Sequence, residues 1–179
     1  MPHIALAQIF SRSASRAGFK LVMTRGFSPR AKISFGPELP AGVIALNEPV
    51  DMYFAQDYND IITALNASLP EGFCVSRVLL PEEGSPNLGK YCKYAEYLLR
   101  STRDIKHLAE EFYGDAVFRS ENADGWLRLI LAEPSQNPIG GFIRHMLNEN
   151  VITGWHEVNI VRVSVGSYDE AEDRVIMNV

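Results

Sequence analysis

The order of hydrophobic patterns in the second half of the chain constrains its fold most strongly. Period-two and helical patterns follow one another there as strand, helix, strand, strand, helix and strand, at residues 91–100, 104–113, 116–120, 126–132, 138–147 and 156–165. Within residues 126–132, Leu127, Leu129 and Leu131 share one strand face. This order predicts an α+β, ferredoxin-like (split βαβ) unit, in which helices cover one face of a four-stranded antiparallel sheet.

The first half repeats this order from its first helix onward. A helical pattern at residues 3–17 precedes extended segments at 19–24, 33–35 and 50–54, then a helix at 57–69 capped by Asp57 and a strand at Gly72–Leu80. A strand pattern ahead of residue 3 is lacking. We therefore expect two ferredoxin-like units side by side, the first without its N-terminal strand. The predicted boundaries are residues 1–80, a linker at 81–89 and a second unit at 90–179.

Composition narrows the class of protein. Hydrophobic residues make up 46% and charged residues 22% of the 179, which excludes disordered and collagen-like chains. The longest apolar runs fall far short of the ~20 residues of a membrane helix, so we expect a cytoplasmic protein without a membrane partner. The two cysteines, Cys74 and Cys92, are expected to be buried free thiols.

Charge is distributed unevenly along the chain. The first 37 residues hold six basic side chains and no acidic one, whereas the remaining 142 residues hold 11 basic and 22 acidic side chains. A local positive field of this kind attracts phosphate groups or an acidic protein surface although the whole chain has a net charge of −5. The alternative is a set of solvated side chains around one helix and one loop.

The least generic stretch lies within this basic segment. Its motif residues are Gly26, Phe27, Pro29, Ser34 and Phe35. Gly26 and Pro29 are turn residues, and backbone N–H groups in such a loop can hold an anion together with Arg30 and Lys32. Neither the P-loop nor the dinucleotide-binding glycine pattern is present.

These residues resemble a bacterial family, the radical SAM-linked proteins, which are fused to or encoded beside radical S-adenosylmethionine enzymes. Family members carry segments similar to H-L-D-L-M-R-x-F-E-R-A-x-R-R-A-G, Q-G-F-N-P-H-P-K-I-S-F-A, L-P-V-G-V and L-P-E-G. The corresponding segments here are residues 3–18, 25–36, 39–43 and 69–72. The resemblance implies a partner role beside a radical SAM enzyme, with RNA as a candidate substrate.

The chain departs from the family pattern at several polar positions. Ala5 replaces an acidic residue, Ser28 an asparagine, Arg30 a histidine and Ala31 a proline. Family members also begin with a strand ahead of the first helix. A carboxylate and an imidazole that a shared activity could use are therefore missing, and the resemblance supplies no reaction.

Candidate catalytic and metal-binding groups are scattered along the sequence. The histidines His3, His107, His145 and His156 form no pair at ligand spacing, and two cysteines cannot hold the three-cysteine cluster of a radical SAM enzyme. We therefore expect no metal and no cofactor. Asp51, Asp57 and Asp60 lie near a strand-to-helix junction, and a pseudouridine-synthase-like enzyme would use one aspartate.

Aromatic residues of the second half leave two interpretations open. Tyr91, Tyr94, Tyr97 and Trp126 could stack RNA bases on an open sheet face. Alternatively, Tyr91 and Tyr97 share one strand face and fill the core between the two units.

The sequence thus favours a non-catalytic accessory module that binds RNA or another anionic substrate for a radical SAM partner. The predicted anion-binding residues are Arg12, Arg16, Lys20, Arg25, Ser28, Arg30 and Lys32. Two alternatives remain: an RNA-modifying enzyme with a pseudouridine-synthase-like architecture, and a protein–protein adaptor whose basic surface docks on an acidic partner. A homodimer formed through the uncovered sheet edge is also expected.

Overall fold

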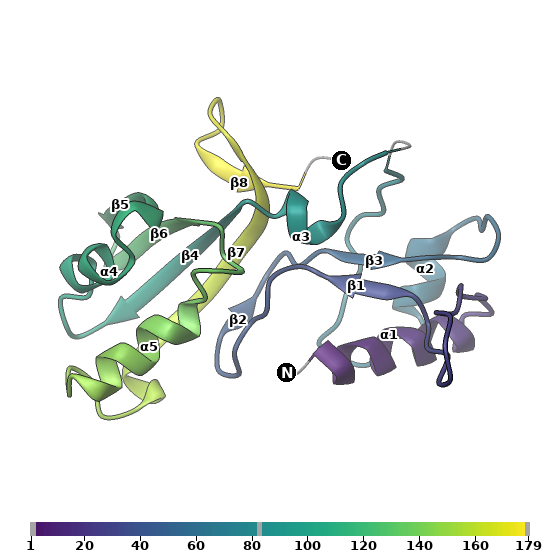
Figure 1. Ribbon diagram of the computed structural model, residues 1–179, viewed down its shortest axis with the longest axis horizontal. Helices are drawn as coiled ribbons and strands as arrows, with labels where there is room; N and C mark the ends of the chain where they lie inside the picture. The colour runs from purple at the N-terminus through teal and green to yellow at the C-terminus, as the bar shows by residue number, and fades with distance from the viewer. Residues whose placement is uncertain (1–2, 82–83, 178–179) are drawn as a thin grey trace. The chain divides into compact units, whose positions relative to one another are not determined.

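The computed structural model describes residues 3–81 and 84–177, and it confirms the α+β fold class (Figure 1). The described residues divide into two compact units, one formed by residues 3–35, 50–81 and 84–85 and the other by residues 36–49 and 86–177. Residues 36–49 thus fold with the second unit, although the sequence places them within residues 1–80. No helix in the described ranges is both long and apolar enough to cross a membrane.

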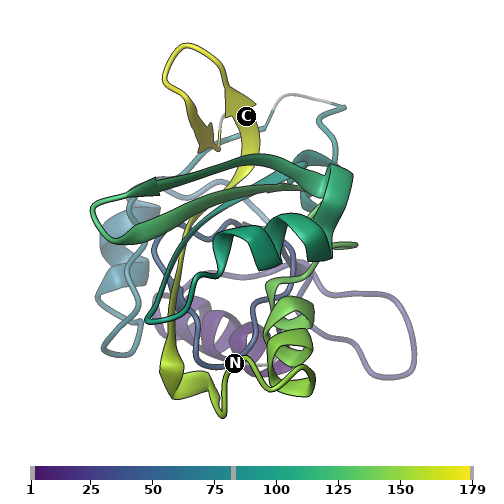
Figure 2. The same cartoon turned by 90° about the vertical axis from the view of Figure 1, so that its left-hand side faces the viewer.

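The second unit contains the predicted split βαβ order. Its elements are β4 (Tyr94–Ser101), α4 (Lys106–Tyr113), β5 (Val117–Ala123), β6 (Trp126–Ala132), α5 (Ile139–Asn148) and β7 (Val158–Asp169). The strands lie in the order β7-β4-β6-β5, and each neighbouring pair is antiparallel. Figure 2 shows α4 and α5 on one side of this sheet, where both helices contribute to the same hydrophobic core.

The core of this unit follows from the alternation of the strands. Leu127, Leu129 and Leu131 are buried on the helix-covered face, as their spacing predicts. Tyr97 lies in the same core, and Tyr91 packs against it. Tyr91 belongs to α3 (Leu88–Tyr91), a short helix that begins within the expected linker and whose Leu88 is buried.

Two short strands that the sequence does not predict extend the second sheet. β2 (Ile44–Ala45) pairs in parallel with β7. β8 (Arg174–Ile176) pairs with the end of β7 in an antiparallel hairpin. Two short 3-10 helices, Gly114–Ala116 and Trp155–Glu157, complete the unit.

The first unit is smaller and packs two helices on a short sheet. Its elements are α1 (His3–Arg16), β1 (Ile33–Phe35), β3 (Val50–Met52) and α2 (Ile61–Asn66). β1 and β3 are antiparallel, and residues 19–24 join them through the bridges Leu21↔Phe54 and Met23↔Ala31. Ala14, Phe19 and Leu65 form its buried centre.

Helix α1 ends where the sequence predicts. Gly18 adopts a φ of +81°, and the amide of Phe19 donates to the carbonyl of Ala14 at 2.8 Å. This left-handed residue terminates the helix and turns the chain into the extended segment that follows.

Three expectations for the first unit are wrong. The predicted strand Gly72–Leu80 joins no strand of the described chain; instead, the Asn66 side chain bonds both backbone groups of Val75, at 2.7 and 2.9 Å. The second helix starts at Ile61, so Asp60 rather than Asp57 occupies the N-cap position. Cys74 is exposed because it lies in the unpaired segment, whereas Cys92 is buried, and neither of these two described cysteines forms a disulfide.

Candidate nucleic-acid interface

The predicted basic residues of α1 lie on the side of the small sheet that the helices cover. Arg12 is exposed. Arg16 donates to the Ser13 hydroxyl at 3.0 Å and to the Ser68 carbonyl at 2.5 Å. Ser13 is itself buried and donates to the same carbonyl at 3.1 Å. Arg16 therefore ties the end of α1 to the chain that follows α2.

The motif forms a hairpin that projects from the sheet. The amide of Thr24 donates to the Arg30 carbonyl at 2.7 Å, the amide of Arg30 donates to the Thr24 hydroxyl at 3.0 Å, and the amide of Lys32 donates to the Val22 carbonyl at 2.7 Å. The tip between these bonds is residues 25–29. Gly26 has a φ of +136°, a conformation that other residues rarely adopt.

The hairpin tip exposes an aromatic side chain that lies between two arginines in the sequence. Phe27 has a relative exposure of 111%, and Arg25, Ser28 and Arg30 are also exposed. Burying a phenylalanine side chain stabilises a fold by about 1.5–3 kcal/mol relative to exposing it. Because Phe27 is fully exposed, its side chain adds none of this stabilisation to the hairpin. The tip is therefore available for a ligand.

The base of the motif has a structural role instead. The Phe35 ring packs against Phe10 of α1, with ring centroids 6.1 Å apart. Ser34 donates to the Asp51 carboxylate at 3.3 Å across the β1–β3 pair. Of the five motif residues, Ser34 and Phe35 thus anchor the hairpin, while Gly26, Phe27 and Pro29 shape its tip.

A second part of the interface is the sheet face that the helices leave open. Because Phe19 and Leu21 pack into the core, strand alternation places Lys20 on the opposite face. Lys32 lies on this face as well, with its Nζ 3.7 Å from the centre of the exposed Tyr53 ring. Tyr53 was not among the predicted site residues, although its position between the core residues Met52 and Phe54 indicates an outward side chain.

The structure thus divides the predicted residues between two faces. Lys20 lies on the open face of one strand, and Arg30 and Lys32 lie two positions apart on the same face of the strand beside it. Arg25 and Ser28 lie at the adjoining hairpin tip. Arg12 and Arg16 lie on α1, which packs on the opposite face. Within residues 3–81 and 84–177, no ion pair neutralises any of the six basic side chains.

Residues 1–130 match a family model described as an uncharacterized protein conserved in bacteria (DUF2344). The chain belongs to this bacterial family. The DUF2344 match spans the whole hairpin and continues through β5 and most of β6. No curated protein and no solved structure matches the chain.

The aspartates considered for catalysis have local partners or lie on the surface. Asp51 bonds Ser34, Asp57 is exposed, and Asp60 is the N-cap residue of α2 with a φ of 54°. Among the described residues, no three histidine, cysteine, aspartate or glutamate side chains gather as a metal site. The side chain of His3 lies outside the described part of the chain.

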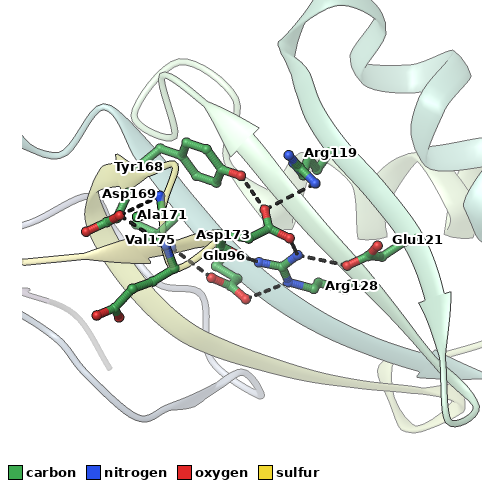
Figure 3. A network of polar contacts seen from close by, with 10 residues as sticks. Glu96, Arg119, Glu121, Arg128, Tyr168, Asp169, Ala171, Asp173 and Val175 are labelled. Carbon is green, nitrogen blue, oxygen red and sulfur yellow. Dashed lines mark hydrogen bonds and ion pairs between the residues drawn. The ribbon is translucent and has the colours of Figure 1, made fainter.

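The second unit carries an arginine-centred network on the sheet face away from its helices (Figure 3). Arg128 donates through Nε to Glu96 at 2.8 Å and through Nη1 to Glu121 at 2.8 Å and Asp173 at 3.2 Å. The second oxygen of Glu96 accepts from the backbone of Val175 at 3.0 Å. These bonds hold the β7–β8 hairpin against the sheet.

The pKa values in this network are shifted by the contacts in Figure 3. A hydrogen bond from the Tyr168 hydroxyl, followed by the charges of Arg119 and Arg128, lowers the pKa of Asp173, and the same bond raises the pKa of Tyr168. Burial alone would lower the pKa of Arg128, but its hydrogen bonds to Glu96 and Glu121 raise it. Every buried polar side-chain atom in the described chain has a partner, so this network stabilises the fold and offers no free group to a ligand.

Proposed function

We propose that this protein binds single-stranded RNA through the hairpin tip and the open sheet face of its first unit. The observation that carries the proposal is the fully exposed Phe27 between Arg25 and Arg30. Each nucleotide of a single strand offers the flat face of its base and a charged phosphate. Proteins bind such nucleotides with aromatic rings that stack on the base and basic side chains that contact the phosphate. Tyr53 and Lys32 continue the same combination on the open face.

The role we propose is that of a non-catalytic accessory module in the cytoplasm. The resemblance of the hairpin segment to radical SAM-linked proteins supports a radical SAM enzyme as partner. That enzyme would supply the chemistry, since two cysteines do not suffice for its cluster. This protein would hold the RNA or a related anionic substrate.

The test measures binding of a fluorescently labelled oligouridylate by anisotropy at several salt concentrations. Replacing Arg25, Arg30 and Lys32 by alanine should weaken binding and reduce the slope of log K against log salt by about 2, because each neutralised phosphate of a single strand contributes about 0.7. Phe27→Ala should weaken binding by about 1–3 kcal/mol and leave the slope unchanged, since stacking carries no counterion release.

Arg144→Ala, which removes an exposed arginine of the second unit, is the matched control and should leave both quantities unchanged. Circular dichroism verifies that each variant folds, because exposed charges contribute only about 0.5 kcal/mol. An unchanged slope in the triple variant would refute RNA binding at this surface. It would favour the protein–protein adaptor, for which exposed phenylalanine and arginine are also suited.

A further inference from the structure

The sheet of the first unit has one paired edge and one free edge. The amide of Tyr53 donates to Lys32 at 3.2 Å, its carbonyl accepts from Val22 at 2.8 Å, and the amide of Ala55 donates to Lys20 at 2.8 Å. Because the backbone groups of successive strand residues point to opposite edges, those of Val50, Met52 and Phe54 face the other edge. No backbone group of the described residues pairs with them there.

This edge is held in place by its side chains. Met52 and Phe54 pack against the buried centre of the unit, and Phe54 lies 5.5 Å from Phe19, centroid to centroid. The strand therefore presents a fixed row of donors and acceptors, which is a template for another strand.

The second unit shows which strand belongs at such an edge. Its first strand, β4, lies between the third and fourth, β6 and β7, and is antiparallel to both. In the first unit, β3 takes the place of the third strand, and the chain runs from helix α1 without a described strand before it. The free edge of β3 thus corresponds to the position of a first strand.

The segment that corresponds to the fourth strand supports this comparison. Gly72–Leu80 has the sequence of a strand but joins no sheet, and it leaves Val78, Leu79 and Leu80 exposed by 37%, 37% and 86%. In the second unit the fourth strand pairs with the first. The described residues contain no first strand beside Gly72–Leu80, so this segment lacks the neighbour with which it would pair.

The charge of Asp51 indicates which side chains a strand paired with the free edge of β3 would carry. Asp51 lies on the open face beside this edge; its carboxylate accepts from Ser34 and forms no ion pair with any described residue. A strand with apolar side chains toward the helices and a lysine or arginine on its outer face complements both sides of the edge.

We propose that the free edge of β3 binds one extended segment of a partner polypeptide, antiparallel to β3, with alternating apolar and polar residues and a basic residue on its outer face. The segment completes the backbone pairing of Val50, Met52 and Phe54. This site is separate from the proposed RNA surface, because strand addition covers an edge and leaves the sheet face and hairpin tip free.

The test supplies a strand and measures amide hydrogen exchange by NMR. The probe is an eight-residue segment of valines alternating with threonine and lysine, joined to the N-terminus of the full chain by a flexible glycine-serine linker that gives an effective concentration of about 1 mM. The control carries the same segment with prolines in place of two central valines. We expect the amides of Met52 and Phe54 to exchange at least about tenfold more slowly with the probe than with the control. The amides of Tyr53 and Ala55 should not differ.

Equal exchange of Met52 and Phe54 in the two fusions would overturn the proposal. So would strong protection of these amides in the unfused chain; if that protection rose with protein concentration, the occupant would be a second copy rather than a partner. RNA affinity is measured on the same fusions, and an unchanged affinity is expected whether or not the strand binds. Failure of one proposal is thus distinguishable from failure of the other.

Discussion

The best-defined energetic prediction concerns Arg162, the largest fully buried side chain of the second unit. Its guanidinium bonds the Glu48 carboxylate through Nε at 2.7 Å, the Pro37 carbonyl at 2.8 Å and the Glu38 carbonyl at 3.4 Å. A further amide, that of Leu46, donates to the Arg162 carbonyl at 3.1 Å. One residue of β7 therefore holds most of the segment 36–49 in the second unit.

The perturbation is Arg162→Met, which keeps the length of the side chain and removes every donor. Breaking a buried ion pair from one side costs about 3–5 kcal/mol when the other charge stays buried. The Glu48 side chain is 31% exposed and can be hydrated, so leaving its carboxylate unpaired costs much less than this. The buried carbonyl of Pro37 loses its donor, which costs about 1–3 kcal/mol. Together we expect a loss of about 2–3 kcal/mol, or a shift of about 1–2 M in the urea midpoint.

The assay follows the segment as well as the whole unit. The Trp155 ring packs over Gly42, within 3.4 Å of the position of a Cβ there, so its fluorescence in a Trp126→Phe background reports whether residues 36–49 stay in place. Exchange of the Leu46 amide reports the same opening. Adding Glu48→Gln to Arg162→Met should cost little more, because the partner is already lost. A free energy of unfolding within about 0.5 kcal/mol of the parent value, together with an unchanged exchange rate of the Leu46 amide, would refute this role of Arg162.

Two further predictions concern the β7–β8 hairpin. Gly166→Ala should destabilise the second unit by at least about 2 kcal/mol in urea denaturation, because the new Cβ would lie 2.2 Å from the Ile176 carbonyl oxygen. Gly72→Ala, also at positive φ but in open space, is the control and should cost only about 1 kcal/mol. Equal losses in the two variants would contradict the clash at Gly166. Asp173 has a folded pKa below its unfolded value, so it contributes stability above about pH 4 that is lost as pH falls through the folded pKa. Asp173→Asn should therefore flatten the acid decline of the urea midpoint, and an identical decline would show that Tyr168 and the arginines do not hold this charge.

Sequence patterns predict those elements whose burial alternates regularly. β6 and α5 appear within a residue or so of their predicted limits, because each places regularly spaced apolar residues in the core and has a clear end. β2, by contrast, has two exposed residues, and it exists because Arg162 and β7 hold that stretch of chain. Such pairing depends on side chains more than 100 positions apart, which local pattern does not reveal.

The candidate site shows the same division. The motif and its basic residues were predictable because glycine, proline and charge mark a turn without an apolar face. The separation of Arg16 from the hairpin was not, since it depends on a bond to the Ser68 carbonyl. Gly72–Leu80 was wrongly predicted as a strand because propensity describes one segment, whereas pairing needs a neighbour.

The charge of the two units shapes the salt dependence by which RNA binding is tested. Among the described residues, the first unit has seven basic and four acidic side chains, whereas the second has 10 basic and 16 acidic side chains. At physiological salt, charges more than about 8 Å from the bound strand are screened, so the hairpin acts on RNA through its own arginines. At about 0.01 M salt the screening length reaches about 30 Å, so the basic residues of the hairpin and of the open face all attract the same RNA strand. In the triple alanine variant, where this attraction is removed, binding should weaken most at low salt.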